Sequence, residues 1–194
     1  MKKFVISALT FIMILTLCSC LPNDFKNVND TPVESLPAPQ SLEEVYSLYS
    51  KTERNMSKAD LDALFGEGTP ILDEFGDIKF YNYYNDIKSA GVSVIFDEND
   101  VIKTKTLFFN TKQNLIPFSE PYVELNVPSV KSGLALEDAI KIMDNAVPLE
   151  LSCTFSKEGP LNHEKIYCWY NEDSSNFMLH TENGIIKNVA LYTK

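Results

Sequence analysis

The sequence is poor in arginine and glycine, and negative charge is in excess. Arg54 is the only arginine in the 194 residues, and only seven glycines are present. Acidic residues outnumber lysine and arginine by 27 to 17, which gives a net charge of −10 at neutral pH. Nucleic-acid binding needs a basic surface, because most of its affinity comes from contacts to phosphates. We therefore expect no nucleic-acid partner.

Motifs of the common enzyme classes are absent as well. The chain has no Gly-x-Ser-x-Gly, no His-Glu-x-x-His and no glycine-rich phosphate-binding loop. Its two histidines, His163 and His180, have no partner at the short spacings of a zinc site. The acidic segments 73–77 and 97–100 lack the EF-hand pattern and are typical of solvated turns. We expect no metal, no cofactor and no catalytic residue; an enzyme with an unrecognised site is the alternative.

The first 19 residues are typical of an export signal. Two lysines precede an apolar run over residues 4–17, which is shorter than the roughly 20 residues that a bilayer-spanning helix needs. The run ends in Leu17-Cys18-Ser19-Cys20, which resembles the bacterial lipobox. The resemblance implies cleavage after Ser19 and a lipid on Cys20, because the bulky Leu17 makes Cys18 a poorer acceptor. The alternative is an ordinary secretory signal with two incidental cysteines.

A spacer follows the expected lipidation site, so that residues 20–40 form the lipidated cysteine and a linker. The segment 21–40 contains four prolines, few apolar residues and no periodicity, which is typical of a flexible chain. Two acyl chains anchor a protein stably to a bilayer. We therefore expect a protein held by lipid on the cell membrane, facing outside the cytoplasm.

Two similar segments in the remaining chain, 92–108 and 176–192, each predict a strand, a polar turn and a second strand. Asn99-Asp100 and Asn183-Gly184 favour the left-handed conformations that a tight hairpin needs. The similarity suggests an internal duplication. The matched residues are Glu98 and Glu182, Asn99 and Asn183, Ile102 and Ile186, Lys103 and Lys187, and Leu107 and Leu191.

A helical pattern precedes each hairpin. Ser57, with Asp60 three residues later, resembles a capping box and predicts a helix that ends near Gly66. The second helix is expected over 136–145, and another capping-box pattern at 41–44 predicts an opening helix. Further strands are expected at 78–85 and 122–127. The predicted fold class is α+β, with two tandem repeats of helix followed by a small antiparallel sheet, at 41–120 and 121–194.

The first repeat resembles the SmpA/OmlA/BamE group of small lipoproteins. The likeness rests on the helix ending at Gly66, on Pro70, on an aromatic strand and on the segment Gly91-Val-Ser-Val-Ile-Phe-Asp97. A tandem of such modules is similar to the beta-lactamase inhibitory proteins, whose two sheets form a concave binding face. The resemblance covers about residues 41–194 and is loose in the second repeat. It implies protein binding, in outer-membrane assembly or enzyme inhibition, and assigns no contact residue.

Cys153 and Cys168 are candidates for a disulfide. They flank a turn-rich segment, and a hairpin centred between Pro160 and Leu161 would place them opposite each other. Outside the cytoplasm the bond would persist. It would stabilise the fold by about 3 kcal/mol for a closed loop of about 15 residues. The alternative is two free, buried thiols.

Aromatic residues form the candidate partner face. Tyr81 and Tyr83 share one face of an expected strand, and Tyr167 and Trp169 share one face of another. Tyrosine and tryptophan are favoured interface anchors, although the same rings could pack in the core. The favoured function is a membrane-anchored, non-catalytic module that binds an envelope or secreted protein. The alternatives are an inhibitor of a secreted hydrolase acting through the loop 156–164, and a cell-wall or small-ligand sensor using the aromatic face.

Overall fold

The computed structural model describes residues 41–84, 89–110, 120–156 and 163–193. The export signal, the expected lipidation site Cys20 and the spacer lie outside these residues. All the described elements belong to one unit of the chain, residues 35–194. In chain order they are α2 (Leu42–Lys51), α3 (Lys58–Phe65), β1 (Thr69–Leu72), β2 (Ile78–Tyr84), β3 (Ala90–Phe96), β4 (Ile102–Phe109), η1 (Glu124–Ser129), α4 (Leu136–Ile142), β5 (Leu149–Thr154), β6 (Glu164–Tyr170), β7 (Asn176–Glu182) and β8 (Ile185–Tyr192).

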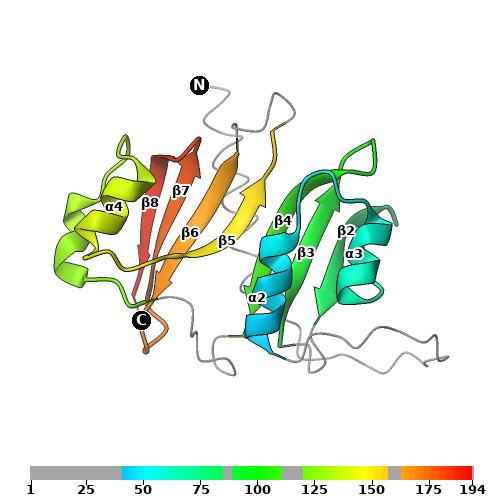
Figure 1. The fold of residues 1–194 in the computed structure, drawn as a ribbon, viewed down its shortest axis with the longest axis horizontal. Helices are drawn as coiled ribbons and strands as arrows, with labels where there is room; N and C mark the ends of the chain where they lie inside the picture. Colours follow the sequence, from blue (N-terminus) through cyan, green and yellow to red (C-terminus); the bar gives the residue numbers. More distant parts are fainter. Residues whose placement is uncertain (1–40, 85–88, 111–119, 157–162, 194) are drawn as a thin grey trace. The chain divides into compact units, whose positions relative to one another are not determined.

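The described strands form one antiparallel sheet of eight, in which each strand pairs with its neighbours in sequence (Figure 1). The junction between the two halves is the β4–β5 ladder, which pairs Thr104–Thr106 with Ser152–Thr154. Hydroxyl pairs reinforce this ladder. The Oγ1 atoms of Thr104 and Thr154 lie 3.2 Å apart, and Thr106 Oγ1 lies 3.0 Å from Ser152 Oγ.

This junction overturns the predicted fold class. We expected an α+β protein with two tandem repeats, each with its own small sheet, and the structure instead shows a mostly β protein with a single continuous sheet. The physical reason lies at the sheet edges. Two small sheets would each leave a strand with unpaired backbone N–H and C=O groups at this position, and the β4–β5 pairing satisfies them.

The local elements agree with the sequence more closely. Ser41 and Ser57 cap α2 and α3 by accepting the main-chain N–H groups of Glu44 and Asp60, and the capping box at Ser57 is complete. Both expected hairpins are present, as β3–β4 and β7–β8. The turn before β8 has Asn183 at φ 55° and Gly184 at φ 75°, the left-handed pair that a two-residue hairpin turn requires. These predictions are confirmed.

The strand expected at 122–127 is wrong. The chain forms the 3₁₀-helix η1 there, with Pro128 inside it. Asn126 N donates to Val123 O at 2.9 Å and Val130 N donates to Val127 O at 3.1 Å. Proline has no N–H for a strand ladder, so a local turn satisfies this segment better than sheet pairing does.

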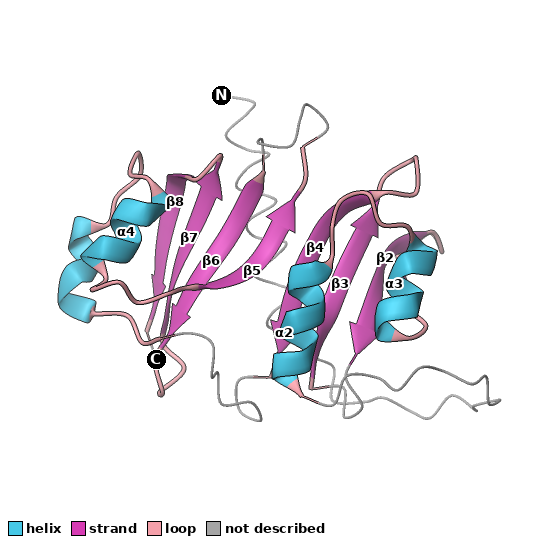
Figure 2. Ribbon diagram, viewed as in Figure 1, coloured by secondary structure: helices cyan, strands magenta, loops and turns pink. Residues whose placement is uncertain are grey.

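Helices cover two parts of one face of the sheet (Figure 2). Helix α2 packs on β3 and β4, and the Phe65 ring at the end of α3 lies 5.2 Å from that of Tyr83 on β2. At the other end, α4 contributes to a core cluster that contains residues of β6, β7 and β8. The buried members of this cluster are Tyr122, Val130, Ala139, Met143, Ala146, Trp169, Phe177, Leu179 and Ile186.

Trp169 is the largest side chain in that cluster and should dominate its stability. It is fully buried, its ring stacks on Phe177 with 5.7 Å between centroids, and its Nε1 donates to Ala146 O at 3.0 Å. We expect Trp169→Ala to lower the free energy of unfolding by about 3–5 kcal/mol, as aromatic-to-alanine changes in cores do. Urea unfolding followed by circular dichroism measures the change. Leu125→Ala, at a side chain that is 90% exposed, is the control, and an equal effect of the two would contradict the core assignment.

Candidate functional site

The aromatic residues expected at a partner face lie on the face of the sheet that carries the helices. Residues paired across antiparallel strands point to the same side. The pairs of Tyr81 with Val94, Val94 with Lys105, Lys105 with Cys153 and Cys153 with Lys165 form one row across five strands. Along each strand alternate residues share this face, so Tyr83, Tyr167 and Trp169 belong to it too.

Two of these four aromatic residues are core residues. Tyr83 is buried beneath α3 and donates its hydroxyl to Asp62 Oδ1 at 3.1 Å, and Trp169 is buried in the cluster with α4. Burial, followed by the charge of Asp62, raises the pKa of Tyr83. Tyr81 and Tyr167 are half-buried, and the Lys58 ammonium lies 5.1 Å from the Tyr81 ring centroid. Tyr83 and Trp169 therefore cannot contact a partner while the protein is folded.

The two candidate disulfide cysteines are both buried, and neither of them forms a disulfide. Cys153 lies opposite Lys165 and Cys168 lies opposite Leu149, so the β5–β6 register differs from the expected one by three residues at Cys153 and by four at Cys168. The structure thus contradicts the predicted Cys153–Cys168 disulfide, because this register places the two cysteines at different positions along the β5–β6 ladder, too far apart to be bridged. Burial raises the pKa of the Cys153 thiol to about 11. Most of the loop between the strands, residues 157–162, lies outside the described part of the chain.

Thiol labelling tests this register. We expect a thiol-specific reagent to modify Cys153 and Cys168 after denaturation without any reductant, and to modify both far more slowly in the native protein because they are buried. Peptide mass spectrometry after labelling distinguishes the two residues from Cys18 and Cys20. Protection of both thiols in the denatured, unreduced protein would show a disulfide and contradict the structure.

Exposed apolar side chains gather where β1 turns into β2. Leu72 is 55% exposed, Phe75 82% and Ile78 53%. We call residues 72–78 the Phe75 hairpin. From the sequence, residues 73–77 were interpreted as a solvated acidic turn and Ile78 as the start of a strand. Three large apolar residues in and beside a polar turn were the feature of the sequence that could have indicated an exposed apolar surface here.

Hydrogen bonds within the turn fix the position of Phe75. Asp73 Oδ1 accepts the main-chain N–H groups of Phe75 at 2.9 Å and of Asp77 at 3.0 Å. Asp73 N donates to Asp77 O at 2.8 Å, and Gly76 adopts φ 88°, which side chains other than glycine rarely tolerate. The turn therefore presents the Phe75 ring to solvent in an ordered conformation.

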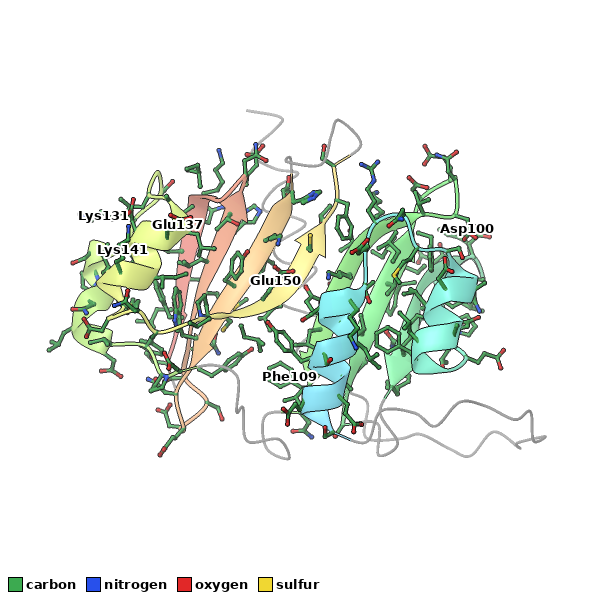
Figure 3. All side chains as sticks on the ribbon, in the orientation of Figure 1. Asp100, Phe109, Lys131, Glu137, Lys141 and Glu150 are labelled. Carbon is green, nitrogen blue, oxygen red and sulfur yellow. The ribbon has the colours of Figure 1, made fainter. Side chains whose placement is uncertain are left out.

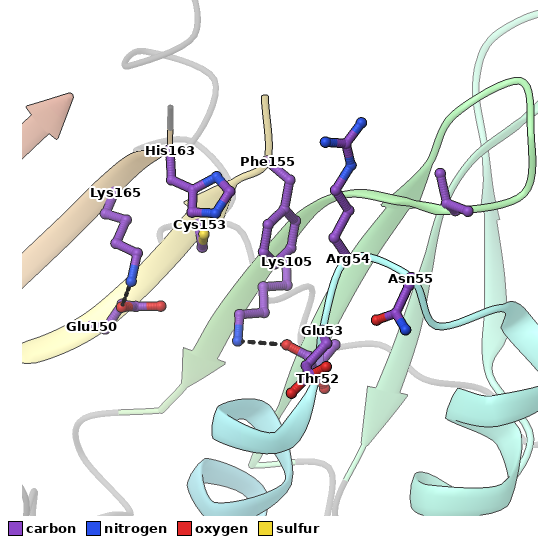
Figure 4. Close-up of a pocket in the computed structure, with 11 residues that line it drawn as sticks. Thr52, Glu53, Arg54, Asn55, Lys105, Glu150, Cys153, Phe155, His163 and Lys165 are labelled. Atoms are coloured by element: carbon purple, nitrogen blue, oxygen red, sulfur yellow. Dashed lines mark hydrogen bonds and ion pairs between the residues drawn. The ribbon is translucent and has the colours of Figure 1, made fainter. Parts of the chain in front are cut away.

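A pocket of about 700 Å³ lies on the helix-bearing face, beside the end of α2 and above β4, β5 and β6 (Figure 4). Both charged and apolar groups line it. The lining includes Glu53 and Arg54 after α2, Lys105 on β4, Glu150 and Cys153 on β5, Phe155 after β5, His163 before β6 and Lys165 on β6.

Lys105 is buried at the floor of this pocket and binds the end of α2. Its Nζ donates to Tyr49 O at 2.7 Å and to Thr52 O at 2.9 Å, and lies 4.2 Å from the Tyr49 ring centroid. The C-terminal end of a helix carries negative partial charge, which favours a cation at this position. Burial lowers the pKa of Lys105, and Glu150 opposes this effect.

Glu150 joins the same helix to the next strands. Its Oε1 accepts the Tyr49 hydroxyl at 3.2 Å and its Oε2 accepts Lys165 Nζ at 2.7 Å. Figure 3 shows Glu150 on β5, in the part of the sheet between the two groups of helices. Burial, and then the Glu150 carboxylate, raises the pKa of Tyr49 well above its usual range, so this phenol remains a hydrogen-bond donor.

The described residues hold neither a cluster of metal-ligating side chains nor a membrane-spanning helix. Within residues 41–84, 89–110, 120–156 and 163–193, no three side chains of histidine, cysteine, aspartate or glutamate come together in a way that could hold a metal ion. In the same part of the chain, no helix has the length and apolar character needed to cross a membrane.

Comparisons with known proteins show a similarity of fold and no similarity of sequence that would indicate a function. No protein-family model matches the chain, and no curated protein matches it. A solved structure from Streptococcus mutans, with the provisional designation of beta-lactamase inhibitor protein, aligns over 77% of this chain and 96% of its own at 15% identity, with a TM-score of 0.51. A DUF4309 family protein from Bacillus subtilis aligns over 79% of this chain and 95% of its own at 17% identity, with a TM-score of 0.30.

The first of these likenesses supports the beta-lactamase inhibitor-like resemblance at the level of the fold. It does not bear on the resemblance to the SmpA/OmlA/BamE group, nor on the lipid anchor. At 15% identity it carries over no contact residue and no partner.

Proposed function

We propose that this chain is a lipid-anchored, non-catalytic protein of the cell envelope that binds another extracytoplasmic protein through the Phe75 hairpin. One observation carries the proposal: Leu72, Phe75 and Ile78 are exposed together on a single ordered turn. Clustered exposed apolar side chains are costly in water, and they mark interaction sites on soluble domains.

The hairpin has the energetic features of an interface anchor. Burying a side chain such as Phe75 contributes about 1.5–3 kcal/mol to binding, and aromatic anchors are common hot spots. Because the Asp73 hydrogen bonds already order the turn, little conformational entropy is lost on binding. The neighbouring carboxylates of Glu74 and Asp77 favour a partner with an apolar pocket bordered by basic groups.

The expected anchor and spacer fit this function. A lipid on Cys20 would hold the protein at the membrane, and residues 21–40 would separate the folded part from it. A 20-residue chain spans at most about 70 Å when fully extended. The start of the folded part could therefore lie up to that distance from the membrane surface.

Inhibition of a secreted hydrolase is a second candidate function, and the shape of the same hairpin favours it. An ordered turn with one exposed aromatic ring at its tip fits an enzyme cleft as well as a shallow pocket. The Streptococcus mutans protein of similar fold has the designation of beta-lactamase inhibitor protein. A nitrocefin hydrolysis assay with purified beta-lactamases tests this candidate directly.

Phe75→Ser tests the docking surface. We expect the full chain in its own membrane to crosslink to one envelope or secreted protein, and Phe75→Ser to weaken the measured affinity for that protein by about 30-fold or more, as hot-spot changes of 2 kcal/mol or more do. Leu125→Ser is the matched control, because Leu125 is also exposed and apolar but lies on η1. Equal capture and affinity with Phe75→Ser would contradict the proposal.

Cys20→Ala tests the anchor separately. We expect this change to abolish lipid attachment, so that the protein partitions out of the membrane fraction or accumulates with an uncleaved leader. Globomycin-type inhibition of lipoprotein signal cleavage should instead leave the leader on a precursor whose Cys20 already carries the lipid, so the masses of the two precursors differ. If Cys18→Ala has this effect and Cys20→Ala does not, the assigned lipidation site is wrong.

A further inference from the structure

The outer edge of β8 is covered over only part of its length. β8 is the last strand in the order of the sheet and pairs with β7 (Figure 1). At its start, Gly133 N donates to Ile186 O at 2.8 Å and Ile186 N donates to Leu134 O at 2.8 Å. Beyond Ile186, no described residue outside β7 forms a main-chain hydrogen bond with β8. Among the described residues, the second half of β8 is therefore an open sheet edge.

The outward main-chain groups of this edge belong to Val189 and Leu191. Val189 pairs with Leu179 and Leu191 pairs with Phe177 across the β7–β8 ladder. Leu179, Phe177 and Ile186 all belong to the core cluster with α4, so Val189 and Leu191 share the face of Ile186. Along a strand, residues whose side chains share a face also direct their N–H and C=O groups to the same edge. These groups of Val189 and Leu191 thus point outward, as those of Ile186 do.

The side chains of the open half favour contact with another chain. Val189 is 43% exposed, Leu191 47% and Tyr192 36%. Residues 188–192 contain no charge and no proline, and the irregular register of β8 lies before them. Edge strands that avoid pairing are short or carry lysine, proline or a bulge. β1, the opposite edge, has these features, because it is four residues long, contains Pro70 and pairs through an irregular register.

A second copy of β8 fits this edge. A strand that pairs with itself in antiparallel orientation forms a two-fold interface, in which a surface contacts its own counterpart. The apolar Val189 and Leu191 flank Ala190 evenly, so the open half is complementary to itself. Because residues 188–192 carry no charge, two copies meet no like charge there, although the net charge of the chain is −10.

We propose that this protein forms a two-fold dimer by antiparallel pairing of β8 with β8 of a second copy, with Ala190 on the axis. In this register Val189 of each copy lies opposite Leu191 of the other, and their outward N–H and C=O groups bond to one another. β8 ends at Tyr192, which lies opposite Asn188 of the other copy. The pairing therefore stops before the covered start of the strand.

The dimer does not rest on the proposed protein-binding function. The Phe75 hairpin joins β1 to β2, at the opposite end of the strand order from β8. Pairing through β8 therefore leaves both hairpins of the dimer exposed. Two hairpins in one dimer raise the avidity for a partner that has two sites within reach.

Cysteine crosslinking tests the register. Residues opposed in a non-hydrogen-bonded antiparallel pair have Cα atoms about 4.5 Å apart, within the reach of a disulfide. We expect the full chain with Ala190→Cys, in its own membrane, to form a covalent dimer with a mild oxidant. Asn188→Cys is the matched control, because it shares the strand and the face but lies about 13 Å from its counterpart in this register. Equal yields from the two positions, or no more dimer from Ala190→Cys than from the unaltered chain, would overturn the proposal.

Sedimentation of the full chain in detergent tests the interface without a crosslink. We expect a monomer–dimer equilibrium, and Leu191→Lys should weaken it at least tenfold, because the two lysines repel each other and apolar contact is lost. Leu72→Lys is the control, since Leu72 is an exposed leucine on the opposite edge strand. Circular dichroism checks that both variants fold.

Three results would contradict the dimer. These are equal effects of the two lysine variants, a monomer at every concentration, and a monomer that captures an extended segment of another protein through β8. Phe75→Ser should leave the dimer intact, so failure of the hairpin proposal and failure of this one give different results.

Discussion

The pairing of β4 with β5 is the constraint on which the rest of this structure depends. Only three residue pairs form the ladder, between Thr104–Thr106 and Ser152–Thr154. They are reinforced by two hydroxyl pairs and by the hydrogen bond from Ser152 Oγ to Lys105 O at 3.0 Å. This short ladder turns two groups of strands into one sheet, and it removes two strand edges that would otherwise be open to pairing with other chains.

The pocket exists because of this junction. The ladder places Lys105 of β4 beside Cys153 of β5, and Cys153 beside Lys165 of β6. Helix α2 ends above this row, where Lys105 binds its last carbonyl groups and Tyr49 reaches Glu150. Groups about 50 to 100 residues apart in sequence thus surround one cavity. Each of these contacts stabilises the helix on the sheet as well as shaping the pocket.

Two surfaces of the protein differ in shape and in chemistry. The Phe75 hairpin exposes apolar side chains and is ordered by the Asp73 carboxylate, features that suit insertion into a partner. The pocket is concave and combines an apolar wall with charged side chains of both signs, among them Arg54, Lys105 and Glu150. The two surfaces share no residue.

The sequence by itself determined the local structure. The helix starts at Ser41 and Ser57 and the turn at Asn183-Gly184 depend on contacts within a few residues, so nearby side chains are enough to specify them. The hairpins β3–β4 and β7–β8 each pair two strands that follow one another directly in the chain. The tertiary structure alone decided the β4–β5 pairing, the register that separates Cys153 from Cys168, and the burial of Tyr83 and Trp169. A strand pattern shows which residues share a face, but which strand pairs with it and which face a helix covers depend on packing between distant segments. For the same reason, of the four predicted partner-face residues only Tyr81 and Tyr167 remain partly exposed, and the pocket was not foreseen.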